Sequence, residues 1–141
     1  MIDELSESVL SKQKPFLGIC VGMQLLANVS HENGHHIGLG WIEGNIKKIS
    51  SNNLKLPHMG WNEVKIKKNN ELIKEENSHN DYYFVHSYHF ECSFKDNEVG
   101  TTNYGLNFSS AISKENIFGV QFHPEKSSLQ GLKILKNFIN L

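Results

Sequence analysis

The chain has 141 residues, 38% of them hydrophobic and 21% charged, which suits one domain spanning residues 1–141 and excludes an intrinsically disordered chain. Its 14 basic and 15 acidic side chains nearly cancel, so nucleic acid is not an expected partner. No apolar run approaches the roughly 20 residues of a membrane span, and two cysteines cannot build a disulfide framework, which together favour a cytoplasmic protein without a membrane partner.

The N-terminal half predicts a helix, then a strand that turns sharply into a second helix, then more strands. Ile2 to Ser11 carries apolar residues at helical spacing and indicates a surface helix. Pro15 to Ile19 is a short apolar run typical of a strand, and Val21 to Val29 resumes helical spacing. The next expected elements are a polar loop over His31 to Gly40, strands over Trp41 to Ile49 and Met59 to Ile66, and one or two helical turns over Glu71 to Glu76.

The C-terminal half predicts sheet followed by one amphipathic helix. Strands are expected over the stretches rich in aromatic and β-branched residues, which are Asp81 to Phe94, Val99 to Asn103, Ala111 to Ser113 and Ile117 to Phe122. The final helix, Leu129 to Leu141, is expected behind a cap at Ser127 and Ser128. Its predicted apolar stripe consists of Leu129, Leu132, Leu135, Phe138 and Ile139. The elements together predict an α/β domain.

Gly18-Ile19-Cys20-Val21-Gly22 has the form of a nucleophile elbow with cysteine in place of serine. A thiol at such a strand-to-helix turn is exposed, and the helix N-terminus is expected to favour its thiolate form. The N–H of Val21 would be free to donate to an oxyanion. The alternative is a buried Cys20 that packs as a small apolar side chain between glycines.

His123-Pro124-Glu125 follows the apolar strand Ile117 to Phe122, where a side chain can point into a cleft. Residues two apart in an extended segment share a face, so Glu125 is expected to orient the ring of His123. The alternative is a loop histidine and an acidic residue before the last helix. Cys20, His123 and Glu125 together would supply a nucleophile, a general base and an orienting group, the minimum set for acyl transfer through a thioester.

The remaining histidines do not predict a metal site. His86 and His89 would point to opposite faces of one strand, and Cys92 would lie roughly 20 Å from His86. His31, His35 and His36 lie in a loop without a carboxylate or cysteine cluster at ligand spacing. No metal and no cofactor are therefore expected. The lysines at positions 47, 48, 65, 67 and 68 alternate with acidic and asparagine residues and indicate solvated sheet edges.

Four motifs, in this order, closely resemble the class I glutamine amidotransferases: Gly18-Ile-Cys-Val-Gly-Met-Gln-Leu-Leu26, Pro57-His-Met-Gly-Trp-Asn62, Tyr83-Phe-Val-His-Ser-Tyr88 and Gly119-Val-Gln-Phe-His-Pro-Glu-Lys-Ser127. The second and fourth most resemble the glutaminase subunits of imidazole glycerol phosphate synthase, in the histidine pathway. The resemblance implies a flavodoxin-like α/β sheet with helices on both faces. It also implies that several N-terminal strands of the family, and a Pro-Gly-x-Gly oxyanion segment, have no counterpart in this sequence.

Roles carried over from the resemblance fall on matching positions. Cys20 resembles the nucleophile, His123 the acid/base, Glu125 its orienting group and Val21 an oxyanion donor. Three positions resemble contacts to the substrate L-glutamine, namely Gln24, Ser87 and Tyr88. Three more match the contact with a separate (β/α)8-barrel cyclase subunit in a heterodimer, namely Trp61, Asn62 and Lys126. Without the resemblance, Trp61 would be assigned to the core.

The resemblance implies a glutaminase that hydrolyses glutamine to glutamate and ammonia and passes the ammonia to the cyclase. One variant of this hypothesis has the ammonia serve a sugar-modifying partner in surface polysaccharide synthesis. A different hypothesis is a truncated, non-catalytic binding module on a synthase barrel, which would keep Trp61, Asn62 and Lys126 useful and make Cys20 expendable. A lost oxyanion donor typically costs about a hundredfold or more in rate, so the 141 residues alone are expected to turn over glutamine poorly.

Overall fold

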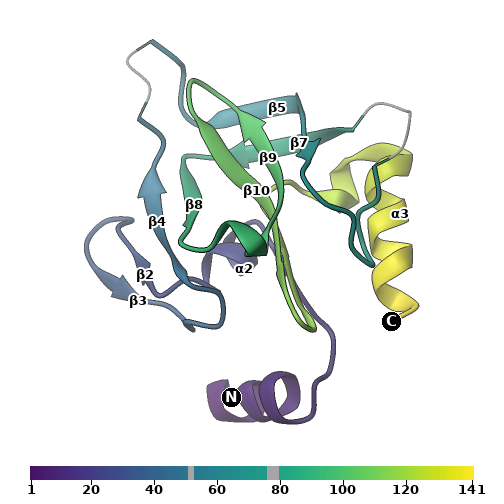
Figure 1. Ribbon diagram of the computed structural model, residues 1–141. Coiled ribbons are helices and arrows are strands. Elements are labelled where there is room, and N and C mark those ends of the chain that lie inside the picture. The colour runs from purple at the N-terminus through teal and green to yellow at the C-terminus, as the bar shows by residue number, and fades with distance from the viewer. Residues whose placement is uncertain (51–52, 76–79) are drawn as a thin grey trace.

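The computed structural model describes residues 1–50, 53–75 and 80–141. Most strands join one mixed sheet in the order β1-β11-β10-β8-β4-β2-β3, with β9 paired to β10 and β6 to β9 (Figure 1). Its strands are β1 (Phe16–Ile19), β2 (Val29–Ser30), β3 (His36–Ile37), β4 (Gly44–Lys48), β6 (Lys65–Ile66), β8 (Tyr88–Cys92), β9 (Glu98–Asn103), β10 (Asn107–Lys114) and β11 (Ile117–Val120). The pairs β1·β11 and β2·β4 are parallel, and the other pairs of this sheet are antiparallel.

Two further strands, β5 (His58–Glu63) and β7 (Asp81–His86), form a separate antiparallel pair. The predicted strands Met59 to Ile66 and Asp81 to Phe94 are therefore each divided between two sheets. The chain leaves β7 at Ser87 and enters β8 in the large sheet. This crossing places Ser87 and Tyr88 where the two sheets meet, which matters for the site described below.

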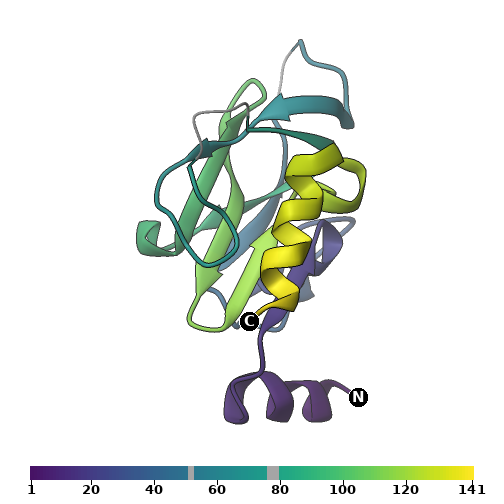
Figure 2. The same cartoon turned by 90° about the vertical axis from the view of Figure 1, so that its right-hand side faces the viewer.

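The helices are α1 (Ile2–Ser6) continued by the π-helical turn η1 (Glu7–Ser11), α2 (Val21–Gln24), α3 (Ser128–Ile139) and the 3₁₀ turns η2 (Lys95–Asn97) and η3 (Pro124–Lys126). The predicted N-terminal surface helix is confirmed, and both views show it at one end of the molecule (Figures 1 and 2), with Val9 of η1 buried in a core cluster. No helix in the described ranges is long and apolar enough to cross a membrane.

Both faces of β11 are buried, and one helix packs on each face. Phe118 and Val120 belong to a core cluster that includes Ile134 of α3. Ile117 belongs to a second cluster that includes Met23 of α2. The expected α/β sheet with helices on both faces is confirmed, and the ends of β1 and β11 lie between these two layers.

Helix α2 is shorter than predicted, ending at Gln24 instead of Val29. The carbonyl oxygens of Leu25, Leu26 and Ala27 accept hydrogen bonds from the backbone N–H groups of Leu39, Ile42 and Gly40, respectively. Those long-range bonds replace the next turn of the helix. The spacing of apolar residues along the sequence cannot predict them, because their partners lie in a distant segment.

Three other local predictions are wrong. Residues 71–75 are not helical, because the Asn70 side chain accepts hydrogen bonds from the backbone N–H groups of Leu72 and Ile73. The last residue of that prediction, Glu76, lies outside the described residues. Ser127 does not cap α3 with its side chain. Leu129, Leu132 and Ile139, assigned to the buried stripe, are 79%, 55% and 81% exposed, because α3 turns Gly131 and Ile134 toward the sheet instead.

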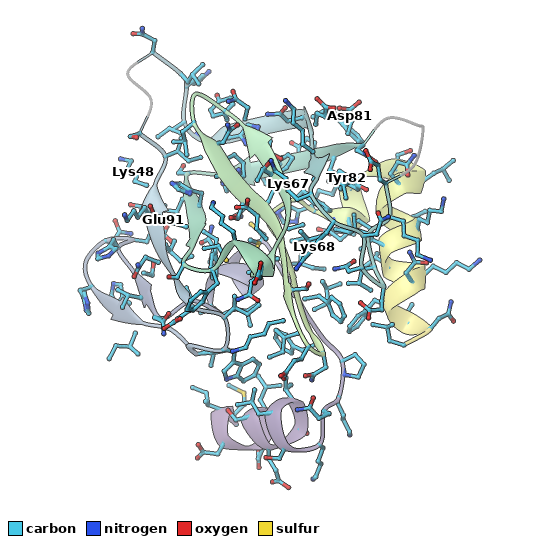
Figure 3. The ribbon with its side chains drawn as sticks, in the orientation of Figure 1. Lys48, Lys67, Lys68, Asp81, Tyr82 and Glu91 are labelled. Carbon is cyan, nitrogen blue, oxygen red and sulfur yellow. The ribbon has the colours of Figure 1, made fainter. Side chains whose placement is uncertain are left out.

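Lysines on the large sheet are solvated, as expected, but not all lie at its edge. Lys48 on β4 and Glu91 on β8 lie in the part of the sheet that is far from α3 (Figure 3), on opposite faces of the β4·β8 pair. Lys47 forms an ion pair with Glu91. Strand β4 lies between β8 and β2 and is therefore interior, whereas Lys65 lies on β6, which pairs with β9 at the margin of the described sheet.

Candidate active site

Cys20 lies at a sharp turn between β1 and α2. Its backbone has φ 52° and ψ −108°, a conformation that non-glycine residues rarely adopt and that is typical of strained functional turns. A side chain at Gly18 would place its Cβ 2.5 Å from the carbonyl oxygen of Gly22, so only glycine allows this close approach. The Cys20 N–H donates to the Val120 carbonyl at 2.8 Å, which ties the turn to β11. The predicted strand and elbow are confirmed in geometry, and the helix after the elbow is present but shorter than predicted.

The sulfur of Cys20 is half-buried and is approached by two N–H donors. Gln121 Nε2 lies 3.6 Å from Sγ, and the backbone N–H of Val21 also interacts with it. Burial has the largest effect and raises the pKa of the Cys20 thiol. The Val21 and Gln121 donors lower this pKa, whereas the carboxylates of Glu125 and Glu32 raise it. The expectation that the helix N-terminus leaves a thiolate is therefore wrong, because the four-residue α2 does not offset the loss of water.

His123 and Glu125 form the predicted pair, with Nδ1 of His123 2.7 Å from Oε1 of Glu125. The contact is made through a 3₁₀ turn rather than along an extended segment. The His123 N–H donates to the Tyr83 carbonyl at 2.9 Å, and the Ser127 hydroxyl donates to the His123 carbonyl at 2.6 Å. Both bonds fix the backbone from which the imidazole projects.

Strand pairing brings the two halves of the site together. Ile19 is in register with Val120 in the parallel pair β1·β11. Cys20 and the segment leading to His123 therefore leave the sheet at the same edge, the carboxyl end of both strands, where α/β folds place their sites. The negative charge of the Glu125 carboxylate raises the pKa of the Cys20 thiol, as expected of two side chains that lie at the same edge of the sheet.

Gln24 and Tyr88, two predicted substrate contacts, touch each other. The Gln24 side chain donates from Nε2 to the Tyr88 carbonyl at 3.0 Å and to Oε1 of Gln121 at 3.1 Å. Ser87 precedes Tyr88 at the crossing between sheets, and its carbonyl accepts from the Ile49 N–H. Gln24 and Tyr88 are therefore connected through Gln121 to the sulfur of Cys20.

The three residues assigned to a partner surface are accessible. Trp61 is 56% exposed on β5 and is not the core residue that its type alone would suggest, and its ring contacts Tyr83 edge to face at 6.1 Å. Asn62 is half-buried, and Lys126 is exposed on η3. Because the Tyr83 carbonyl also accepts from the His123 N–H, the Trp61 surface lies one strand away from His123.

Two residues that influence the Cys20 thiol, Gln121 and Glu32, were not predicted from the sequence. Gln121 is fully buried at the end of an apolar strand. A buried polar side chain needs hydrogen-bond partners, so a glutamine in this apolar stretch was the sequence feature that could have indicated a polar site. Glu32 lines a cavity of about 180 Å³ beside Val21 and Gln24. No local motif marks Glu32, since it comes from the loop before β3.

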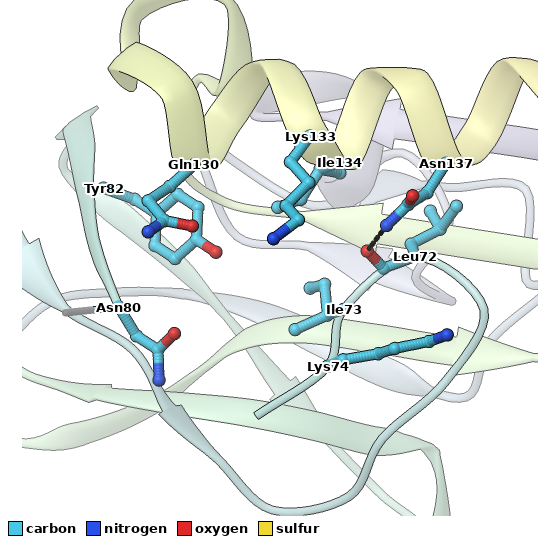
Figure 4. Close-up of a pocket in the computed structure, with 9 residues that line it drawn as sticks. All are labelled: Leu72, Ile73, Lys74, Asn80, Tyr82, Gln130, Lys133, Ile134 and Asn137. Carbon is cyan, nitrogen blue, oxygen red and sulfur yellow. Dashed lines mark hydrogen bonds between the residues drawn. The ribbon is translucent and has the colours of Figure 1, made fainter. Parts of the chain in front are cut away.

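The described residues contain no group of three or more histidine, cysteine or acidic side chains able to hold a metal ion. Another cavity, of about 200 Å³, lies between α3 and the loop around Leu72 (Figure 4). Asn137 donates to the Leu72 carbonyl across it at 2.9 Å (Figure 4). None of the predicted site residues lines this cavity.

The fold and the elbow belong to a known class. Residues 2–141 match the family model described as "Glutamine amidotransferase class-I", and the chain belongs to this family. Within it, the chain is 46% identical over 143 residues to "Imidazole glycerol phosphate synthase subunit HisH" of Pelagibacter ubique, covering 100% of this chain and 69% of that protein. It is 49% identical over 140 residues to "Imidazole glycerol phosphate synthase subunit HisH 2" of Methanococcus maripaludis, covering 99% and 69%.

Solved structures agree on the fold. A putative GMP synthase protein from Thermoplasma acidophilum superposes with a TM-score of 0.66 at 19% identity, over 99% of this chain and 62% of that one. A glutamine amidotransferase from Thermotoga maritima gives 0.64 at 20% identity, over 97% and 52%. The chain thus spans less than two thirds of either solved protein.

Proposed function

We propose that this chain is the glutaminase subunit of an imidazole glycerol phosphate synthase, which hydrolyses glutamine and supplies ammonia for histidine biosynthesis in the cytoplasm. The observation that carries the proposal is the position of two residues at the carboxyl ends of the parallel strands β1 and β11. Cys20 lies in a strained turn after β1, and His123, hydrogen-bonded to Glu125, follows β11. The HisH relatives favour the histidine branch over a sugar-modifying partner.

In the first step, Cys20 Sγ attacks the carboxamide carbon of glutamine. Because burial keeps the thiol protonated at neutral pH, a base must remove its proton during attack, and His123 is the candidate. The resulting imidazolium, stabilised by Glu125, then protonates the departing nitrogen as the C–N bond breaks. Ammonia leaves and a glutamyl thioester remains on Cys20.

In the second step, water adds to the thioester with His123 as base. The C–S bond breaks, the sulfur regains a proton from His123, and glutamate is released. In both steps the carbonyl oxygen becomes negatively charged, and the Val21 N–H beside the sulfur is the donor that this chain offers to it.

The substrate's polar ends match groups near the elbow. Glu32, on the wall of the cavity next to Val21 and Gln24, offers a carboxylate to the α-ammonium group of glutamine. The Ser87 and Tyr88 crossing offers backbone groups to the amino-acid end. These contacts would hold the carboxamide over Cys20.

The proposed partner is a (β/α)8-barrel cyclase that receives ammonia at the surface of Trp61, Asn62 and Lys126. The exposed Trp61 ring beside Met59, which is 62% exposed on the same face of β5, is an apolar area suited to a protein contact. A non-catalytic module would retain this surface without needing Cys20. The strained Cys20 backbone and its two sulfur donors have no purpose in such a module, so we favour the enzyme.

The test uses the protein expressed from its complete gene together with the barrel cyclase of the same organism. We expect a one-to-one complex that forms glutamate from glutamine and imidazole glycerol phosphate from the cyclase substrate. Cys20→Ala should abolish both glutamine-dependent products, while added ammonium salt restores imidazole glycerol phosphate. Glutamate formation by the Cys20→Ala complex, or lack of any complex, would overturn the proposal.

A further inference from the structure

Two buried histidines outside the proposed mechanism face each other across the small sheet. His58 on β5 and His86 on β7 are in register, and Nδ1 of His58 lies 2.9 Å from Nε2 of His86. They are 3% and 6% exposed. Buried polar groups of this kind need complete hydrogen bonding, so their partners show what the pair holds in place.

The direction of every hydrogen bond around the pair is determined by backbone groups. Nδ1 of His86 lies 2.7 Å from the Tyr88 carbonyl oxygen, which can only accept, so this nitrogen carries the hydrogen. Nε2 of His86 is then an acceptor and receives the Nδ1–H of His58. Nε2 of His58 is in turn an acceptor, and Nδ2 of Asn62 lies 3.2 Å from it.

The orientation of the Asn62 amide is also fixed. Its Nδ2 donates to the Asn103 carbonyl at 2.9 Å, and its Oδ1 accepts from the Glu63 N–H at 2.8 Å. Asn62, which we place at the partner surface, is therefore a donor toward His58. The pair has one donor and one acceptor on each ring, and all four are used.

From Tyr88 the connection continues to the nucleophile. The Tyr88 carbonyl also accepts from Nε2 of Gln24, at 3.0 Å. The same Nε2 donates to Oε1 of Gln121, which turns Nε2 of Gln121 toward the sulfur of Cys20. Hydrogen bonds therefore connect Asn62 to Cys20 in two arms that meet at Tyr88, whose carbonyl accepts from His86 on one side and from Gln24 on the other.

The surroundings keep both rings neutral, as this pattern requires. His58 stacks between Tyr104 and Phe84, with ring centroids 4.1 and 4.8 Å away, and His86 packs against Phe108 at 5.0 Å. Burial lowers the pKa of each histidine to about 4. Each ring therefore keeps one bare nitrogen at neutral pH.

We propose that His58 and His86 are positioning residues for the thiol: they fix the Tyr88 carbonyl, which anchors Gln24 and thereby aims the Gln121 N–H at the sulfur of Cys20. The inference rests on the proposed function only in taking Cys20 as the nucleophile. Removing the His86 hydrogen bond would free the Tyr88 carbonyl and weaken the donor that lowers the pKa of Cys20.

The first test is ¹⁵N NMR of the imidazole nitrogens in the unmodified protein. Both His58 and His86 should be neutral with the hydrogen on Nδ1, whereas neutral histidine in water favours Nε2–H. Finding the hydrogen on Nε2 of His86, or a protonated ring at pH 7, would overturn the proposal without any variant.

The second test is the rate at which iodoacetamide alkylates Cys20 near pH 7.5, which needs neither glutamine nor a partner. His86→Leu should slow alkylation about threefold to tenfold, the effect expected of one hydrogen bond. His86→Asn, which keeps a donor near Nδ1, should recover most of the rate. The difference should vanish at a pH high enough to ionise Cys20 fully, a profile that a merely structural role would not produce.

His89→Leu is the matched control. His89 is also buried, also contacts Phe108, at 6.0 Å, and has an Nδ1 without a hydrogen-bond partner among the described residues. It should not slow alkylation. Equal slowing by His89→Leu and His86→Leu, or a folded His86→Leu with the wild-type rate, would contradict the proposal. A positive result with no glutaminase activity would instead count against the proposed function alone.

Discussion

Nδ1 of His123 lies 2.7 Å from Oε1 of Glu125. An ionised carboxylate can only accept, so the hydrogen of a neutral His123 resides on Nδ1, and Nε2 is left with a lone pair for proton transfer. The backbone of His123 is held on both sides by Tyr83 and Ser127. Glu125 thus sets which nitrogen of His123 can act as a base.

Glu125→Gln should lower kcat for glutamine hydrolysis by about a hundredfold or more, because the imidazolium formed on His123 loses its counter-charge. KM should change little, since Glu125 contacts the base and not the substrate. Steady-state kinetics of the complex with its cyclase provide the measurement. Glu71→Gln, an exposed residue distant in the sequence, is the control, and equal kcat values for the two variants would contradict the role.

The alkylation rate of Cys20 should keep rising with pH beyond the range where an unburied cysteine levels off. Burial raises the pKa of this thiol, so the thiolate fraction is small at neutral pH and grows about tenfold per pH unit below the pKa. The measurement is the iodoacetamide rate of Cys20 between pH 6 and 10 in the absence of glutamine. A plateau already reached near pH 7 would show a thiolate and remove the need for a base in the first step.

The stability of the protein should fall as the pH drops from about 6.5 to about 4. His58 and His86 have a pKa lowered from 6.5 to about 4, so the unfolded chain binds protons in this window that the folded chain does not. Their neutral, hydrogen-bonded forms stabilise the fold fully above this window and lose that contribution within it. Each accounts for at most about 1.4 kcal/mol per pH unit.

Urea unfolding of wild type and of a His58→Gln/His86→Gln double variant isolates this contribution. The free energy of unfolding of the double variant should be lower at pH 7 and should depend less on pH between 6.5 and 4. His31→Gln, at an exposed loop position, should retain the wild-type slope. Identical slopes for wild type and the double variant would mean that the pair does not titrate as described.

The elbow and the His123–Glu125 pair were predictable from sequence because each depends on residues close together in the chain. Gly18 and Cys20 fix a local turn, and Glu125 reaches His123 within one turn of 3₁₀ helix. The family resemblance added the roles that no local pattern carries.

The parts that could not be predicted depend on contacts between distant segments. The division of Asp81 to Phe94 at Ser87 follows from pairing with two different strands, β5 and β4. Gln121 reaches Cys20 across 101 residues of sequence. The periodicity of apolar residues indicates the type of a single helix or strand and does not indicate which distant segment it pairs with.

Lys126→Ala should weaken the coupling of glutamine hydrolysis to the synthase reaction with little effect on folding. Lys126 is exposed beside the catalytic segment and forms no ion pair with another described residue, so its charge is available to a carboxylate of the cyclase. The ratio of glutamate to imidazole glycerol phosphate measures coupling and should rise. Lys136→Ala, on the exposed side of α3, should leave the ratio unchanged. An unchanged ratio in Lys126→Ala would remove this residue from the interface.

Covalent labelling by an electrophilic glutamine analogue, such as a diazoketone, tests the central claim most directly. Peptide mapping by mass spectrometry should find the adduct on Cys20, and added glutamine should slow its formation. Cys92, buried on β8 with its thiol bonded to the Phe94 carbonyl at 3.2 Å, should remain unmodified. An adduct on Cys92 alone would contradict Cys20 as the nucleophile of a glutamine site. So would labelling of both thiols at equal rates that added glutamine does not slow.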